Sequence, residues 1–321
     1  MTASLNTGLC QRFGLTAPIV SAPMAMASGG RLAAAVSGAG GLGFIGGGYG
    51  AEAEWIDAQF AAAGNVAVGC GFITWALAER EARAPGLYAS VLERKPAAMF
   101  LSFGDVSGFA QAAQAAGVPV FAQVQSVEGA REALAAGAEV IVAQGSEAGG
   151  HGAMRGTMTL VPEVVDLVGD KAMVLAAGGI ADGRGLAAAL MLGAEGVVMG
   201  TRFWASAEAL VAEGFQAAAL SADGDATLRS SLPDIARGLD WPRPYTIRTL
   251  GNEWTDHWRD VPGGPRDAQA RAAYGKAVAE GDAKRAPAIA GEAVGLIDQV
   301  EPAADIVARM MREAQEVLGR W

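Results

Sequence analysis

Residues 172–203 read AMVLAAGGIADGRGLAAALMLGAEGVVMGTRF, and they contain two short apolar runs separated by an alanine-rich segment. The runs at 172–179 and 196–203 are continuous rather than alternating, which is typical of strands buried on both faces of a parallel sheet. The segment between them has helical spacing and closes on Gly193, a residue suited to a helix C-terminus. The stretch therefore predicts a strand–helix–strand unit with glycine near the end of each strand.

Six further apolar runs precede this unit, and each is followed by glycine or a polar residue and then by an alanine-rich segment. They are residues 18–24, 41–47, 65–72, 97–104, 118–124 and 139–145. Eight buried strands that alternate with helices indicate the α/β class and a (β/α)₈ TIM barrel. An open doubly wound sheet is the alternative, although it would normally have fewer such units.

The amino-acid composition of the chain changes after about residue 214. Tryptophans 241, 254 and 258 appear together with prolines 242, 244, 262 and 265 and mixed charge, and no run there resembles a strand. We expect residues 1–214 to form the barrel, completed by C-terminal helices from residues 291–321. Residues 215–290 are expected to form a smaller, mainly helical second domain that packs over the C-terminal mouth of the barrel as a lid that contacts substrate.

Composition and charge exclude several classes of protein. Hydrophobic residues make up 51% of the chain and charged residues 18%, which is typical of a globular protein. A net charge of −10 without a long basic run argues against nucleic acid or an anionic membrane as the main partner. The start lacks a signal peptide and no stretch has 18 uninterrupted apolar residues, so we expect a soluble, cytoplasmic protein. Cys10 and Cys70 lie far apart and are expected to be reduced thiols.

The two glycine-containing strand ends of the opening stretch predict a phosphate site. In a TIM barrel the catalytic face lies at the carboxyl ends of the strands, and phosphate commonly binds after strands seven and eight. Gly178 and Gly179 let backbone N–H groups approach an anion, and Gly200 and Thr201 add a second pair of donors. The helix that we expect to begin near Ala181 would add the positive end of its dipole.

Other strand ends carry uncharged groups that can line a flat heterocycle and hydrogen-bond to its edge. For any one of them a packing or capping role is the commoner one, so the hypothesis depends on their convergence in one pocket. They are Ala22, Pro23 and Met24 after the first strand, Thr74 after the third, Gln123 after the fifth, and Gln144 and Gly145 after the sixth.

Four motifs together resemble the nitronate monooxygenase family, formerly called 2-nitropropane dioxygenases. They are SAPM at 21–24, AQGSEAGGHG at 143–152, AAGGI at 176–180 and MGTRF at 199–203, and the resemblance covers the barrel. It implies non-covalently bound FMN in a TIM barrel, with the phosphate at Gly178, Gly179, Gly200 and Thr201. It also implies that Gly149 and Gly150 let the loop fold over the flavin and that His151 faces it as the catalytic residue.

A histidine at that place suits the chemistry that the resemblance implies. An imidazole with a pKa of about 6.5 can accept the acidic C–H proton of a nitroalkane or hold the charge of a nitronate. Glu147 is either a partner of His151 or a solvated carboxylate, whereas His257, between tryptophans, is expected to be structural or exposed. Asp256 and Asp260 do not form a convincing ligand set with one histidine, so we assign no metal.

The barrel predicts FMN more firmly than it predicts the reaction, because one fold supports many chemistries. The leading hypothesis is oxidation of alkyl nitronates, and of nitroalkanes as an open extension, by O₂ to a carbonyl compound and nitrite. An NAD(P)H-dependent reductase of quinones or enoyl thioesters on the same flavin remains open, as does a non-redox barrel that binds a phosphorylated ligand. In the first two cases the partner is a small-molecule substrate, and a homo-oligomer is compatible with the sequence.

Overall fold

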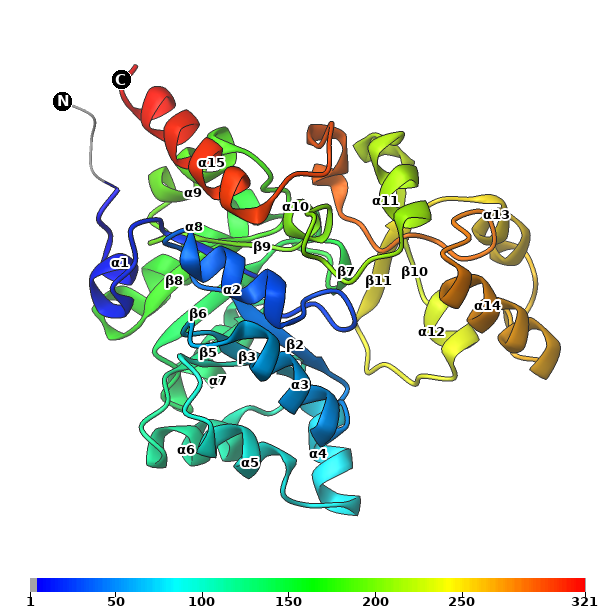
Figure 1. Ribbon diagram of the computed structural model, residues 1–321, viewed down its shortest axis with the longest axis horizontal. Helices are drawn as coiled ribbons and strands as arrows, with labels where there is room; N and C mark the ends of the chain where they lie inside the picture. The colour runs from blue at the N-terminus through cyan, green and yellow to red at the C-terminus, as the bar shows by residue number, and fades with distance from the viewer. Residues whose placement is uncertain (1–4, 321) are drawn as a thin grey trace.

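The computed structural model describes residues 5–320, and their main element is a ring of eight parallel strands (Figure 1). The strands are β1 (Ile19–Ser21), β2 (Phe44–Gly48), β3 (Gly69–Ile73), β4 (Met99–Ser102), β5 (Val120–Val124), β6 (Val140–Gln144), β8 (Met173–Ala177) and β9 (Val197–Met199). They pair in the order β1-β9-β8-β6-β5-β4-β3-β2, and a parallel bridge between Val20 and Leu42 joins the two ends of the sheet. The predicted TIM barrel and its eight strands are confirmed, and the alternative prediction of an open doubly wound sheet is wrong.

Helices cover the outside of the barrel. They are α1 (Gly8–Phe13), α2 (Gly30–Gly38), α3 (Ala53–Ala63), α4 (Thr74–Arg83), α5 (Leu87–Glu93), α6 (Ser107–Ala115), α7 (Val127–Ala135), α8 (Thr157–Val168), η1 (Gly169–Lys171), α9 (Gly183–Met191) and α10 (Thr201–Trp204). The C-terminal helix α15 (Ala303–Leu318) buries Ile306, Val307 and Met310 and packs on α9 and α2. No helix within residues 5–320 is long and apolar enough to cross a membrane.

Aromatic side chains fill the barrel and close its N-terminal end. Phe44 lies with its ring centroid 5.3 Å from those of both Phe100 and Phe121, and all three side chains are fully buried. Helix α1 adds Leu9 to this cluster and places Phe13 with its ring centroid 5.3 Å from that of Phe121. Because the N-terminal end is packed solid, a ligand can enter only from the carboxyl ends of the strands.

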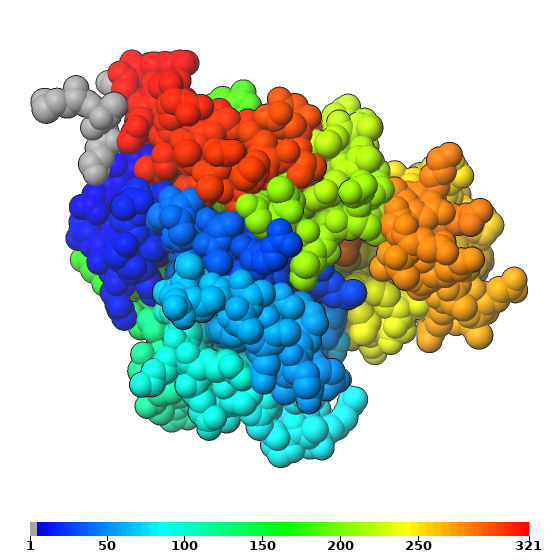
Figure 2. Space-filling view, in the orientation of Figure 1, coloured from blue at the N-terminus to red at the C-terminus, as the bar shows by residue number. Residues whose placement is uncertain are grey.

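Residues 213–296 form a lobe on one side of the barrel, shown in yellow and orange where it stands out most (Figures 1 and 2). Its helices are α11 (Glu213–Leu220), α12 (Leu232–Arg237), α13 (Glu253–Arg259) and α14 (Ala268–Glu280), with short turns η2 (Gly224–Ala226) and η3 (Glu292–Leu296).

The expectation that residues 215–290 contain no strand is wrong. Strands β10 (Thr227–Ser230) and β11 (Thr246–Leu250) form an antiparallel sheet with β7 (Gly150–Gly152), which lies in the loop after β6. Their sequences, TLRS and TIRTL, mix polar and apolar residues instead of forming the continuous apolar runs of the barrel strands. This sheet joins the barrel loop that carries His151 to the side lobe.

Candidate active site

A cavity of about 520 Å³ lies at the carboxyl ends of the barrel strands. This volume falls in the range of small-molecule and cofactor sites. All the residues predicted from strand ends and motifs line it except Thr74 and Gly145; those that do are Ala22, Pro23, Met24, Gln123, Gln144, Gly149, Gly150, His151, Gly178, Gly179, Gly200 and Thr201. The barrel therefore brings together residues that lie as much as 179 positions apart in the sequence, from Ala22 to Thr201.

The two exceptions have structural reasons. Thr74 is fully buried at the start of α4, and Phe72 and Ile73 line the cavity at this strand end. The N–H of Gly145 donates to the carbonyl of Ala177 at 2.8 Å, which ties the end of β6 to the end of β8. A Cβ atom at position 145 would lie 2.0 Å from Oγ1 of Thr157, so this position needs glycine for packing.

Backbone donors gather at the ends of β8 and β9. Gly178 and Gly179 have φ angles of 105° and 73°, a region of backbone conformation that favours glycine. Within residues 5–320 the N–H groups of Gly179, Gly200 and Thr201 donate to no protein acceptor. Backbone N–H groups that converge without acceptors form a natural anion site.

The helix after β8 differs from the expectation. It begins at Gly183 rather than near Ala181, and its first N–H groups already have carboxylate partners. The N–H of Gly183 donates to Glu313 at 2.9 Å, and the N–H groups of Arg184 and Gly185 donate to Asp182. Because these carboxylates already bind the N–H groups at the positive end of the helix, we expect an anion in the cavity to bind the glycine loops after β8 and β9 instead.

Glutamine side chains form a chain across the floor of the cavity. Oε1 of Gln144 accepts hydrogen bonds from Nε2 of Gln123 at 3.2 Å and Nε2 of Gln125 at 2.8 Å, while its Nε2 donates to the carbonyl of His151 at 3.1 Å. Gln123 thus keeps its own Oε1 atom available at the cavity wall, and Gln144 holds the backbone of the histidine strand.

His151 lies on β7 and is 9% exposed. Its Nε2 atom lies 3.0 and 2.9 Å from the two carboxylate oxygens of Asp234, a 2% exposed residue of α12. Nη2 of Arg237 donates to the same carboxylate at 2.6 Å. Glu147 was expected to be a partner of His151 or a solvated carboxylate. Its carboxylate instead accepts hydrogen bonds from the N–H and the hydroxyl of Thr157 at the start of α8.

Aromatic rings hold the imidazole in place. Trp241 stacks on His151 with 3.4 Å between ring centroids and 8° between ring planes, and Phe103 meets His151 edge-on at 6.3 Å. Trp241 is itself held by a 3.0 Å hydrogen bond from its Nε1 to the hydroxyl of Tyr49. His257 is exposed on α13 and does not line the cavity.

The environment of His151 favours the neutral imidazole. Burial lowers its pKa below 6.5, and the nearby carboxylate of Asp234 offsets this only in part, while Arg237 and Arg229 add to the lowering. A neutral imidazole can accept a proton.

The loop that carries His151 is braced by a half-buried arginine. Arg229 of β10 donates to the carbonyls of Ser146 and Ala148 from the loop and of Thr246 from β11. Gly149 packs against the backbone of Gly291, where a Cβ atom would lie 2.5 Å from the nitrogen. The glycines of the EAGGHG motif therefore allow a close backbone approach and a paired strand, not a free loop.

Sequence reasoning missed Asp234, Arg237 and Trp241. They lie in the stretch SLPDIARGLDW, at 231–241, which has no motif spacing relative to His151, and Asp234 is 83 residues from its partner. A single carboxylate in a short helix is usually solvated, so nothing in the sequence distinguished this one.

The fold is that of the TIM-barrel enzymes, in which active sites lie at the carboxyl ends of the strands, where this cavity is found. The family model for nitronate monooxygenase matches residues 80–313. The nitronate monooxygenase npaC of Metarhizium robertsii is 38% identical, over 99% of this chain and 98% of that protein. The chain belongs to the nitronate monooxygenase family of flavin-dependent oxidoreductases, and the resemblance found in its motifs is confirmed.

Solved structures agree with this assignment. FabK from Thermotoga maritima superposes with a TM-score of 0.84 at 30% identity, over 98% of this chain and 97% of that one. Nitroalkane oxidase from Streptomyces ansochromogenes superposes with a TM-score of 0.79 at 26% identity, over 95% and 98% of the two chains. Both similarities extend across the barrel and the side lobe.

Proposed function

We propose that this enzyme oxidises alkyl nitronates with O₂ to a carbonyl compound and nitrite, using bound FMN. The observation that carries the proposal is a buried histidine, hydrogen-bonded to Asp234, that lines the cavity of a barrel that belongs to the nitronate monooxygenase family. When bound, FMN would accept electrons from the substrate carbon and pass them to O₂.

The donor set suits the cofactor. The N–H groups of Gly179, Gly200 and Thr201 would hold its phosphate, because these residues line the same cavity and, within residues 5–320, their N–H groups have no protein acceptor. Ala22, Pro23 and Met24 and the amides of Gln123 and Gln144 would line its ring system, because they lie on the wall of the same cavity.

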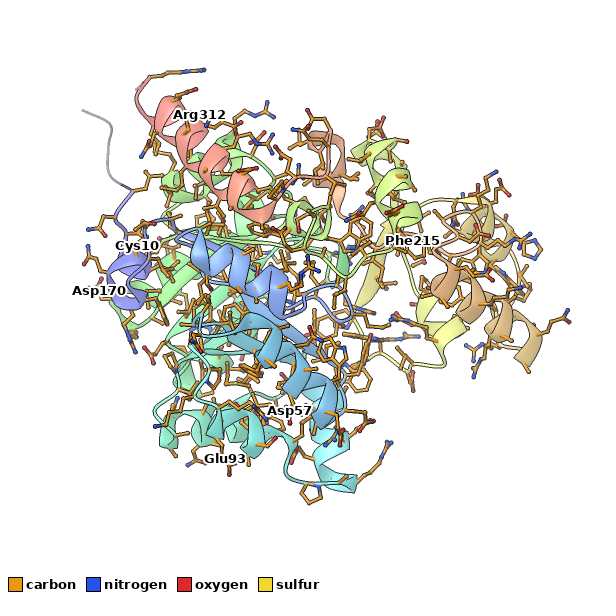
Figure 3. The ribbon with its side chains drawn as sticks, in the orientation of Figure 1. Cys10, Asp57, Glu93, Asp170, Phe215 and Arg312 are labelled. Carbon is orange, nitrogen blue, oxygen red and sulfur yellow. The ribbon has the colours of Figure 1, made fainter. Side chains whose placement is uncertain are left out.

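The side lobe would supply the substrate wall. Four residues of the lobe line the same cavity, namely Phe215, Tyr274, Val278 and Ala279, and Figure 3 shows Phe215 where the barrel meets the lobe. This wall is mainly apolar and suits the alkyl part of a substrate, so we infer that residues 215–290 act as the lid and substrate domain. Arg237 also lines the cavity and supplies a permanent positive charge near the imidazole, which suits an anionic nitronate.

His151 would act as the base when the substrate is a neutral nitroalkane. The carbon of the substrate loses a proton to the imidazole, and the electron pair of the broken C–H bond moves into the nitro group, which gives the nitronate. His151→Asn should retain FMN and the fold but lower turnover of the neutral nitroalkane by roughly 10²- to 10⁴-fold. A preformed nitronate needs no deprotonation, and its turnover should fall much less.

The absorbance spectrum of the purified protein, followed by anaerobic mixing, tests the proposal. Reduction of bound flavin by an alkyl nitronate, and nitrite formation after O₂ is admitted, are the expected results. Flavin that is reduced by NADH or NADPH but not by nitronate would identify a reductase instead. A protein that contains no flavin and takes up none would refute the cofactor assignment.

A further inference from the structure

Asp234 is the one carboxylate that the described residues 5–320 place in hydrogen-bonding distance of His151, and its geometry restricts where the imidazole proton can be. An ionised carboxylate can only accept hydrogen bonds. The ring nitrogen that faces it, Nε2, must therefore carry a proton. A neutral imidazole has one N–H, so Nδ1 then carries the lone pair.

Nδ1 is available to a ligand. Within residues 5–320 no protein group hydrogen-bonds to Nδ1, yet it is not among the sealed, unpaired polar atoms of the interior. Because His151 lines the cavity whereas Asp234 does not, the lone pair belongs to the cavity side of the ring.

The ring is also prevented from turning. Trp241 covers one face with 3.4 Å between ring centroids, and Phe103 packs against the ring in a T-shaped arrangement. The carboxylate is held in turn by Arg237, three residues later on α12. Asp234 and Arg237 are the charged groups that face the imidazole from α12, and Arg229 is the one that faces it from β10.

We propose that Asp234 is a positioning residue that fixes His151 as the Nε2–H tautomer, so that Nδ1 is the atom that takes the substrate proton. After transfer, the imidazolium keeps its Nε2–H bond to the Asp234 carboxylate, which stabilises the new positive charge. The catalytic part of this inference rests on the proposed function, but the assignment of the tautomer does not.

Replacement of Asp234 by asparagine should reverse the tautomer. Arg237 can only donate, so it would take the amide oxygen, which leaves the amide NH₂ facing Nε2 of His151. Nε2 would then have to accept, the proton would move to Nδ1, and the cavity would lose its lone pair.

The chain contains only two histidines, so ¹⁵N-histidine labelling of the full-length protein resolves each ring by NMR, with His257 as an internal reference. For wild type at pH 7 we expect a protonated, pyrrole-type Nε2 and a pyridine-type Nδ1 at His151. In Asp234→Asn the two types should exchange, whereas the signals of His257 should not change. Equal tautomers or an Nδ1–H form in wild type would overturn the proposal, and this measurement requires no variant to fold.

Asp256→Asn is a matched control, because Asp256 and Arg259 form another i,i+3 pair on a helix, but on the exposed helix α13. It should leave the His151 signals and the activity unchanged. Asp234→Asn should lower turnover of a neutral nitroalkane by roughly 10²- to 10⁴-fold, as expected for loss of the base, with a smaller effect on the nitronate. A folded Asp234→Asn variant with wild-type signals and wild-type turnover would refute the positioning role. If wild type turns over neither substrate, the proposed function fails while the NMR result still decides the tautomer.

Discussion

Gly200→Ala separates flavin binding from protein stability. Gly200 has φ of −100° and ψ of −77°, so an alanine there needs no left-handed backbone. A Cβ atom at this position would have Met24 Sδ at 3.6 Å and Ala22 Cβ at 3.9 Å as its nearest neighbours, which is ordinary van der Waals contact. The flavin-free variant should therefore unfold within about 0.5 kcal/mol of wild type.

Flavin affinity should behave differently. The added methyl group is bonded to the Cα atom between the N–H groups of Gly200 and Thr201, so a phosphate held by both groups must move to accommodate it. Loss of one hydrogen bond to a charged group costs about 1.5 to 3 kcal/mol. The Kd for FMN should rise by roughly 10- to 150-fold.

Quenching of FMN fluorescence on titration with flavin-free protein measures the Kd, and urea unfolding of the same preparation measures stability. Gly108→Ala is the control, since a Cβ atom at this exposed position of α6 has no neighbour within 4 Å. Gly178→Ala would not serve, because its φ of 105° and a 2.9 Å approach to Thr157 would add strain. An unchanged FMN affinity in Gly200→Ala would show that the phosphate lies elsewhere.

Three further predictions concern the surroundings of the base. Trp241→Phe and Tyr49→Phe each remove the 3.0 Å hydrogen bond between these residues and should each lower the free energy of unfolding by about 1 kcal/mol; the double variant should lose little more. Arg229→Lys removes a planar donor that bonds three carbonyls and should cost about 2 kcal/mol in urea unfolding. Because burial lowers the pKa of His151, the unfolded chain binds its proton at a higher pH than the folded one. Stability should therefore fall as the pH drops below about 6.5, with a shallower slope in His151→Phe, measured by urea midpoints across this range.

The barrel could be predicted because its strands are buried on both faces. Such strands appear as continuous apolar runs, such as 140–144 and 173–177, that stand out against the alanine-rich helices between them. Strands β10 and β11 belong to a small sheet with intermediate burial at many positions, and their mixed sequences do not stand out from a loop. Their pairing with β7 is a long-range effect that local patterns do not record.

The candidate site also contains positions that local sequence patterns indicate and positions that depend on long-range packing. The position of the glycines at 178, 179 and 200 on the cavity wall could be predicted because the carboxyl ends of barrel strands meet at one mouth. Thr74 could not be excluded, since whether a residue at a strand end faces the cavity or the core depends on the start of the next helix. Asp234 could not be found, because its partner is set by the docking of α12 and not by spacing.

In the proposed mechanism, cofactor binding and proton transfer belong to different parts of the chain. The unpaired N–H groups that suit a phosphate all belong to barrel strand ends, at 179, 200 and 201. The groups that orient the imidazole, Asp234 and Trp241, both come from the side lobe, and β7 is the strand that brings His151 to them. Substitutions in residues 227–250 should therefore alter the base while flavin remains bound, and substitutions at the barrel glycines should release flavin while the base keeps its geometry. A barrel organised in this way can retain its cofactor while the lobe changes the chemistry, which is consistent with one fold serving several reactions.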